Sequence, residues 1–279
     1  MSRYFNRPSA PPMRLAVLDA ETLAPPVADG GFPPWPAHIP VCVSILIADS
    51  KRYGEWYFRL ETVSFRDDPA TAIERVSYLL ERRTMIGFNS RGFDAGVLAL
   101  AAARATKLEL AGLNRIWSAN RYDQAAHIDV ADLWSNFGAA RGAGLETLCT
   151  ALAIPVKTDA HGSDVAAMMA QGQFDRVCRY CESDVAATLC LAAVGIGMRH
   201  SDPGYAASLI SSFGRFVADN GIDHLSAFER LDGAEEYDRL ALLHQLTTGI
   251  EAIEHRQQMR FVTHLPGQSD AFAQDHSDG

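Results

Sequence analysis

Apolar and polar positions alternate along the first hydrophobic stretch of the chain, residues 14–22, which reads Arg-Leu-Ala-Val-Leu-Asp-Ala-Glu-Thr. Successive side chains of a β-strand point to opposite faces, so Leu15, Val17, Asp19 and Glu21 share one face. Short apolar runs bounded by turn residues predict four more strands, at 41–48, 55–60, 84–88 and 127–130. The pattern thus predicts five strands, of which the first three form a meander.

Helical spacing dominates the rest of the chain. Asp68 followed by Pro69 is typical of a helix start, with an N-cap before a proline at the first helical position. Further helices are expected at 95–103, 145–153, 163–171, 174–194, 205–220 and 235–258.

The helix expected at 174–194 is the longest of the α/β portion. Its apolar residues recur at spacings of three and four, as in a helix with one buried face. Tyr180 and Asp184 lie four residues apart and therefore share a neighbouring face. The buried stripe consists of Val177, Cys181, Val185, Leu189 and Ala192.

The chain of 279 residues is long enough for one α/β domain with an added element. We expect a flexible tail at 1–12, a main domain at 13–195, a helical extension at 196–265 and a disordered tail at 266–279. Residues 23–40 carry six prolines and are expected to form one long loop. Loops of this length are usually functional or mobile.

Composition narrows the functional classes. The net charge of −9 argues against a protein that coats long nucleic acid, since such binding neutralises many phosphates, but it allows an enzyme that grips a chain end. The sequence shows neither a run of eighteen apolar residues nor a signal-peptide core, so we expect a soluble, cytoplasmic protein without a membrane partner. Five cysteines, an odd number, suit a reducing compartment, and Cys178 and Cys181 are interpreted as structural.

Four acids fall where strand and helix geometry can bring them together. Asp19 and Glu21 end the first strand, Asp94 follows the fourth, and Asp184 lies on the long helix. The strand ends of an open α/β sheet form its reactive edge. Carboxylates held side by side repel each other unless a cation lies between them, and oxygen ligands select Mg²⁺ or Mn²⁺.

Such a cluster suits in-line displacement at phosphorus by two metal ions. Tyr180 would orient the attacking water, because a phenol with a pKa near 10 is a poor free base. Simpler readings of single residues stay open. Asp19 and Glu21 can end a strand in solvent, Asp94 can cap a helix, and Asp184 can be a solvated helix acid.

Three segments resemble the exonuclease motifs of the DEDD superfamily, which is DnaQ-like. They are Asp-Ala-Glu at 19–21, Asn-Ser-Arg-Gly-Phe-Asp at 89–94 and Tyr-Cys-Glu-Ser-Asp at 180–184. The tyrosine four residues before the last aspartate is similar to the DEDDy branch. The sequences of the second and third segments are most similar to stand-alone proteins related to the exonuclease domain of family B DNA polymerases. The resemblance covers residues from about 13 to 195.

This resemblance implies a ribonuclease H-like α/β fold, with a mixed five-stranded sheet flanked by helices and followed by a C-terminal helical appendage. It implies 3′→5′ hydrolysis at the 3′ end of single-stranded DNA or RNA with two divalent metal ions, Mg²⁺ or Mn²⁺. A phosphodiesterase on short oligonucleotides is the alternative among enzymes. The alternative outside that class is a catalytically silent nucleic-acid-binding module or assembly subunit that docks through its terminal helices.

The resemblance also implies roles for individual residues. Asp19, Glu21 and Asp184 would hold the nucleophile-side metal, with Asp19 bridging to the second. Asp94 would reach the second metal through water, and Tyr180 would position the attacking water. The residues expected to contact substrate are Thr22, Asn89 and Phe93.

Other candidates carry weaker signals. Asp129 and Asp132 follow the fifth strand and can approach the metals without belonging to the four-acid set. His161 lies in a loop before a helix start. Trp35, in the proline-rich loop, is a candidate for base stacking, since single strands are gripped by aromatic platforms.

Overall fold

The structure is a computed structural model of the 279-residue chain. It describes residues 11–27, 31–51, 54–156 and 164–263, with side chains up to residue 254. Most of the tail expected at 1–12, all of the tail expected at 266–279 and the loop residue His161 lie outside the described residues.

A mixed five-stranded sheet forms the centre of the molecule. Its strands follow the order β3-β2-β1-β4-β5. β2 is antiparallel to both β1 and β3, whereas β4 is parallel to β1 and β5 is parallel to β4. The mixed sheet and the opening meander are therefore confirmed. The strands are β1 (Arg14–Leu23), β2 (Ile39–Ser50), β3 (Trp56–Ser64), β4 (Thr84–Gly87) and β5 (His127–Asp129).

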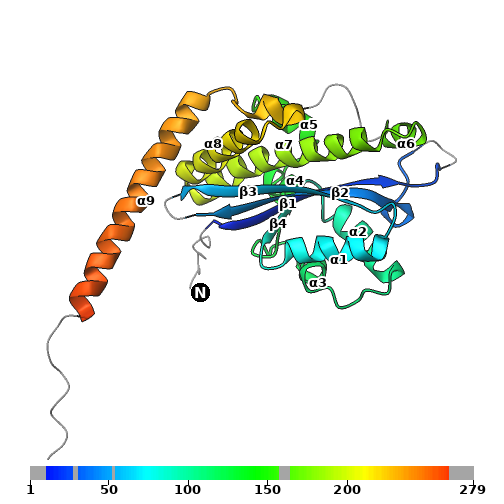
Figure 1. The fold of residues 1–279 in the computed structure, drawn as a ribbon, viewed down its shortest axis with the longest axis horizontal. Coiled ribbons are helices and arrows are strands. Elements are labelled where there is room, and N and C mark those ends of the chain that lie inside the picture. The colour runs from blue at the N-terminus through cyan, green and yellow to red at the C-terminus, as the bar shows by residue number, and fades with distance from the viewer. Residues whose placement is uncertain (1–10, 28–30, 52–53, 157–163, 264–279) are drawn as a thin grey trace, which may run out of the picture.

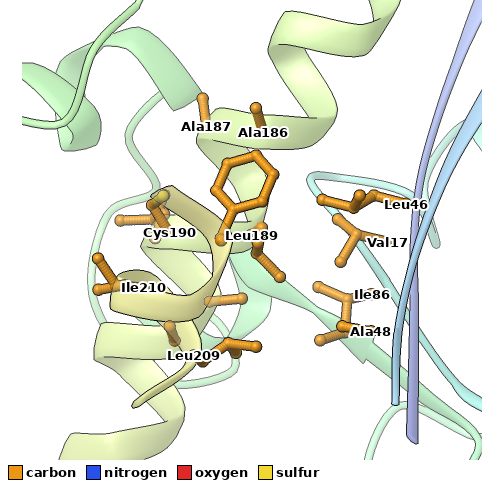
Figure 2. Close-up of a cluster of buried hydrophobic side chains, with 14 of the residues drawn as sticks. Val17, Leu46, Ala48, Ile86, Ala186, Ala187, Leu189, Cys190, Leu209 and Ile210 are labelled. Atoms are coloured by element: carbon orange, nitrogen blue, oxygen red, sulfur yellow. The ribbon is translucent and has the colours of Figure 1, made fainter. Parts of the chain in front are cut away.

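Helices cover both faces of this sheet (Figure 1). The alternation along β1 assigns its side chains as expected: Leu15 and Val17 are buried in the core under the long helices, and Ala16 and Leu18 in the core on the opposite face. Figure 2 shows Val17 among the sheet residues that meet the first of these cores. One face carries α1 (Pro69–Leu80), α2 (Asp94–Arg104) and α3 (Ala111–Ser118), and the other α7 (Phe174–His200) and α8 (Pro203–Asn220).

Helix α7 confirms the predicted stripe, since Val177, Cys181, Val185, Leu189 and Ala192 are all 0% exposed. It continues to His200, past the expected end at Val194. By length and composition alone α7 could cross a membrane, but 78% of its apolar window is buried inside the fold. Its apolar character is therefore explained by its place between the sheet and α8.

Several features of the chain depart from the expected elements, among them short helices at 111–118, 130–134 and 223–228. The proline-rich loop is shorter than expected, because β2 already begins at Ile39 and the 3-10 helix η1 (Trp35–Ala37) interrupts the loop. Helix α3 was not expected: its N-cap makes no side-chain hydrogen bond, and a long-range contact fixes it, with the Leu113 N–H donating to Ser77 Oγ at 3.2 Å. The remaining short helices are α4 (Val130–Trp134), α5 (Leu145–Ala151), α6 (Val165–Ala170) and η4 (Asp223–Phe228).

The C-terminal helices differ in their packing. α8 belongs to the core: Trp56 of β3 stacks edge-on against Tyr205, and its Nε1 donates to Ser208 Oγ at 3.1 Å. The last helix, α9 (Ala234–Thr263), packs against α8 and then runs away from the body (Figure 1).

Candidate active site

The carboxyl end of β1 projects acids toward α7. Asp19 and Glu21 share the face predicted by strand alternation, and Cys181 of α7 meets them there. Carboxylate oxygens of the two acids and the Cys181 Sγ all lie within 4.8 Å of one another. The Cys181 thiol is 3.4 Å from Asp19 Oδ2. This edge of the sheet therefore gathers metal-ligating atoms from two distant parts of the chain.

Tyr180 and Asp184 join the same cluster from α7. Burial, followed by the charges of Asp184, Glu21 and Asp19, raises the pKa of the Tyr180 phenol well above its usual range. A hydrogen bond between Tyr180 and Asp184 acts in the same direction on this pKa. The phenol is therefore neutral at physiological pH and can donate a hydrogen bond.

Asp94 reaches the cluster from the start of α2. Its side chain is 4% exposed, and the residue at the N-cap position is Phe93, so the geometry does not support the simple capping role. Burial and then the charge of Asp19 raise the pKa of Asp94, while backbone hydrogen bonds at Asp94 and Ala20 lower it. Asp94 is therefore linked to Asp19, and Tyr180 links Asp184 to Asp19 and Glu21, through their charges, whereas the atoms within 4.8 Å of one another belong to Asp19, Glu21 and Cys181.

This donor set fits divalent cations. Buried carboxylates whose charges oppose each other gain from a cation between them, and hard oxygen donors suit Mg²⁺ and Mn²⁺. The Cys181 sulfur is a softer donor that the sequence reading had assigned only to the core. The apolar spacing along α7 did not predict that Cys181 contacts Asp19.

The turn between β4 and α2 is held by Asp129. Its carboxylate accepts the backbone N–H groups of Asn89 and Arg91, both at 2.9 Å, and that of Ala131 at 3.0 Å. Asn89 has a φ of 53°, a left-handed conformation that asparagine tolerates. A Cβ on Gly92 would lie 2.8 Å from Asn89 Oδ1, so glycine makes room for that side chain. The Asp129 carboxylate therefore anchors the backbone of this turn.

The other weak acidic candidate also has a structural partner. Asp132 forms an ion pair with Arg121. Two further residues of the turn are tied to β5: Ser90 Oγ lies 2.8 Å from His127 Nε2, and Arg91 Nη2 donates to the His127 carbonyl at 2.5 Å. Burial, then the charges of Arg91 and Arg115, lowers the pKa of His127 to about 3. No local pattern predicted this contact between the turn and His127.

Three aromatic rings stack beside the acids, and we call Phe32, His38 and Phe93 the aromatic stack. The ring centroids of Phe32 and His38 are 4.9 Å apart, and those of His38 and Phe93 are 4.8 Å apart. Thr22 Oγ1 lies 2.7 Å from His38 Nδ1. Phe32 is 77% exposed, so the stack presents a free ring next to the cluster.

Trp35 does not have that freedom. A Cβ on Gly96 would lie 2.8 Å from the Trp35 ring, so this side chain packs closely on α2. It thereby docks the proline-rich segment onto the helix that begins at Asp94. The role in base stacking suggested for Trp35 stays a prediction, and α2 covers part of its ring.

A polar chain fixes α7 next to the sheet. Glu182 accepts a hydrogen bond from Thr62 Oγ1 at 2.6 Å, and its other oxygen lies 2.6 Å from His224 Nε2 of η4. Thr62 Oγ1 is also 2.8 Å from Ser44 Oγ, opposite Asp19 in the strand register. Glu182 therefore holds the helix segment that carries Tyr180 and Asp184.

Comparison with known proteins identifies a family. Residues 31–194 match the model of a family described as predicted 3′–5′ exonuclease related to the exonuclease domain of PolB. The match includes the second and third motifs and starts after Asp19 and Glu21. No curated protein sequence matches the chain.

Solved structures show more distant similarity. A family B DNA polymerase from the hyperthermophilic archaeon Pyrobaculum calidifontis is 18% identical, with a TM-score of 0.46, over 72% of this chain and 26% of the polymerase chain. Product-bound exonuclease I is 16% identical, with a TM-score of 0.43, over 70% of this chain and 46% of the other. The chain therefore spans less than half the length of either protein.

The family match covers more than half of the chain and includes the second and third motifs, and the chain also has the expected mixed five-stranded sheet. The predicted ribonuclease H-like fold is confirmed. The chain belongs to the family of predicted 3′–5′ exonucleases related to the exonuclease domain of PolB.

Proposed function

We propose that this protein removes nucleotides from the 3′ end of single-stranded nucleic acid with two divalent metal ions, Mg²⁺ or Mn²⁺. The proposal is supported by the close approach of Asp19 and Glu21 to α7, by the charge of Asp19 that acts on buried Asp94, and by the charges of Asp184, Glu21 and Asp19 that act on Tyr180. The five cysteines are free, which suits the cytoplasmic location that we also propose.

The site residues would have different roles in this reaction. The ions, when bound, would supply Lewis-acid activation of the attacking water and stabilisation of the leaving oxygen. Asp19, Glu21 and Asp184 would hold the nucleophile-side ion, and Asp94 would serve the other. Tyr180, whose pKa is raised further above an already high phenol value, would stay protonated and orient the water rather than remove a proton from it.

The surroundings of the acids favour a single-stranded end. The exposed ring of Phe32 offers a stacking surface for a base, and such stacking contributes about 1–3 kcal/mol per base. Thr22 and Phe93 would act through this stack, since both contact His38, and Asn89 lies exposed at the rim. The net charge of −9 gives little support for gripping a long duplex.

The test is hydrolysis of 5′-labelled single-stranded DNA and RNA of several lengths with Mg²⁺, with Mn²⁺ or with EDTA. We expect a ladder of products shortened from the 3′ end, none with EDTA, and weak cleavage of a blunt duplex. An Asp19→Ala preparation controls for contaminating nucleases.

Each rival has its own result in the same assay. Cleavage confined to oligonucleotides of a few residues would identify the phosphodiesterase. Tight binding without cleavage in either ion would identify the silent binding module and overturn the proposal.

A further inference from the structure

Helix α9 carries an apolar surface on the side that faces away from the body. We call it the outer stripe, and its side chains are 47–57% exposed. Within the residues that the structure describes, nothing covers it, and in Figure 1 the helix leaves the body. The outer stripe consists of Leu242, Leu243, Leu246, Ile250 and Ile253.

The opposite side of α9 is already used. Ala241 is 4% exposed, and the His244 ring fits against two glycines: a Cβ on Gly204 or on Gly54 would lie 2.5 Å from it. At 3.6 residues per turn, Ala241 and His244 project about half a turn away from the centre of the outer stripe. Leu242 also borders the cavity between α8 and the first turns of α9, with Ile210 and Ala241. The seating of α9 on the body does not require the other four residues of the stripe, which are open to a partner.

We propose that the outer stripe binds the same stripe of a second copy of this chain, so that the protein is a two-fold symmetric dimer through antiparallel α9 helices. Leu243, Leu246, Ile250 and Ile253 are separated by three, four and three residues, the spacing of a coiled-coil seam. A self-complementary patch of this kind is what a two-fold interface requires.

The size of the surface agrees with a dimer. Five half-exposed aliphatic side chains and their neighbours would bury on the order of 500 Å² on each copy, or about 1,000 Å² in total, near the lower limit for a specific interface. Exposed apolar patches of several hundred Å² often mark interaction sites.

Charge selects the antiparallel direction. If the two-fold axis passes near Leu246, Leu243 faces Ile250 of the partner subunit and Arg239 faces Glu254 of the partner subunit. In a parallel pair each Arg239 would face the same arginine of the other copy, and each Glu254 would face the same glutamate. Like charges that face each other across a helix pair are destabilising, so the antiparallel pair is favoured.

Acidic neighbours also separate this proposal from membrane binding. Glu251 and Glu254 flank the stripe, and Glu235 and Glu236 lie at the start of the helix. An anionic lipid surface attracts basic residues and repels these. A second copy offers Arg239 to Glu254 in the antiparallel register, whereas an anionic lipid surface offers no such cation.

The decisive measurement is sedimentation of the full chain from about 1 to 100 µM. We expect a dimer, and we expect Leu246→Glu combined with Ile250→Glu to sediment as a monomer with an unchanged helical circular dichroism spectrum. The control is Leu108→Glu, at a side chain that is 66% exposed outside α9, and it should remain a dimer. A monomeric wild type at 100 µM, or a dimeric double variant, overturns the proposal.

The direction of the helices has its own test. Arg239→Glu and Glu254→Arg should each weaken the dimer about threefold, as expected for exposed ion pairs, and the combination of both should restore it. Because Arg239 also pairs with Glu236 on its own helix, the restoration and not the single effects is decisive. Additive weakening in the combined variant would rule out the antiparallel register.

Discussion

Asp94 and Asp129 are two buried acids at neighbouring parts of the same sheet edge, and their surroundings differ. They are 4% and 6% exposed, and burial is the first cause of a raised pKa in both. The Asp129 carboxylate accepts hydrogen bonds from three backbone N–H groups. For Asp94 the second cause is the charge of Asp19.

This difference separates a scaffold acid from a candidate ligand. A carboxylate that accepts three backbone hydrogen bonds has few lone pairs left and is stabilised by the fold itself. A carboxylate that faces another acid is destabilised until a cation arrives. Burial and raised pKa alone would therefore have assigned both residues to the same role.

The same substitution at the two sites should give opposite results. Asp94→Asn should reduce hydrolysis of a labelled oligonucleotide by about 10³-fold or more. The change removes a proposed ligand of the metal ion that would stabilise the charge developing in the transition state. Its free energy of unfolding should stay the same or rise, since repulsion from Asp19 is relieved. Asp175→Asn, an exposed acid of α7, is the control and should keep its activity. Full activity in Asp94→Asn would refute the assignment.

Asp129→Asn should instead lower the free energy of unfolding by about 2–4 kcal/mol, because an amide cannot accept the three N–H groups that the carboxylate accepts. Denaturant titration measures this loss. Activity per folded molecule should fall far less than in Asp94→Asn. An unchanged midpoint together with lost activity would move Asp129 from the scaffold to the ligands.

Metal binding should depend on Asp94 and not on Asp129. Mn²⁺ at about 100 times its dissociation constant should stabilise the wild type by about 2–3 kcal/mol in thermal unfolding. The stabilisation by Mn²⁺ should be smaller in Asp94→Asn. In Asp129→Asn it should persist when the variant with Mn²⁺ is compared with the same variant without it. Equal gains in both variants would place the ion elsewhere.

His127 offers a smaller effect on the scaffold side. Its pKa is about 3 in the folded chain against 6.5 for an unperturbed ring, so the unfolded chain binds the proton first as pH falls. The stability that this group contributes is complete above pH 6.5 and is lost toward pH 3. Between pH 7 and 5 the loss is about 2 kcal/mol. His127→Gln should lack this part of the pH dependence, and equal slopes in the two proteins would exclude it.

Phe32 should show the smallest effect on the substrate side. Phe32→Ala is expected to raise KM for a single-stranded oligonucleotide about fivefold with little change in kcat, at the lower end of the stacking range. Stability should be nearly unchanged, because the ring is 77% exposed. Tyr57→Ala removes a comparably exposed ring of β3, and its KM should not move. A fivefold rise in that control as well would remove the special role of Phe32.

The strands, the long helix and the four acids were readable from the sequence, because periodicity and local spacing determine them. Leu15 and Val17 occupy the predicted core, and Asp19 and Glu21 lie on the predicted face. The position of Asp94 beside Asp19 followed from the general rule for strand ends. The assigned roles of these acids remain predictions that the variants above test.

The rest depended on contacts that no local pattern contains. Ser90 meets His127 across 37 residues, and Glu182 meets Thr62 across 120. The short helix α3 is fixed by Ser77 rather than by its own caps. Phe32 and Trp35 lie in the same proline-rich segment, and packing on Gly96 distinguishes the partly covered Trp35 ring from the 77% exposed Phe32.

The packing of α8 against β3 decides where the chain can be shortened. Tyr205 and Phe213 are 2% and 1% exposed, against Trp56 and Phe58 of the edge strand. A cut at residue 195, where the catalytic motifs are already complete, would fall inside α7 and leave these rings in water. The smallest fragment that folds should therefore retain α8 and η4, so that the three sequence motifs do not by themselves mark an autonomous unit.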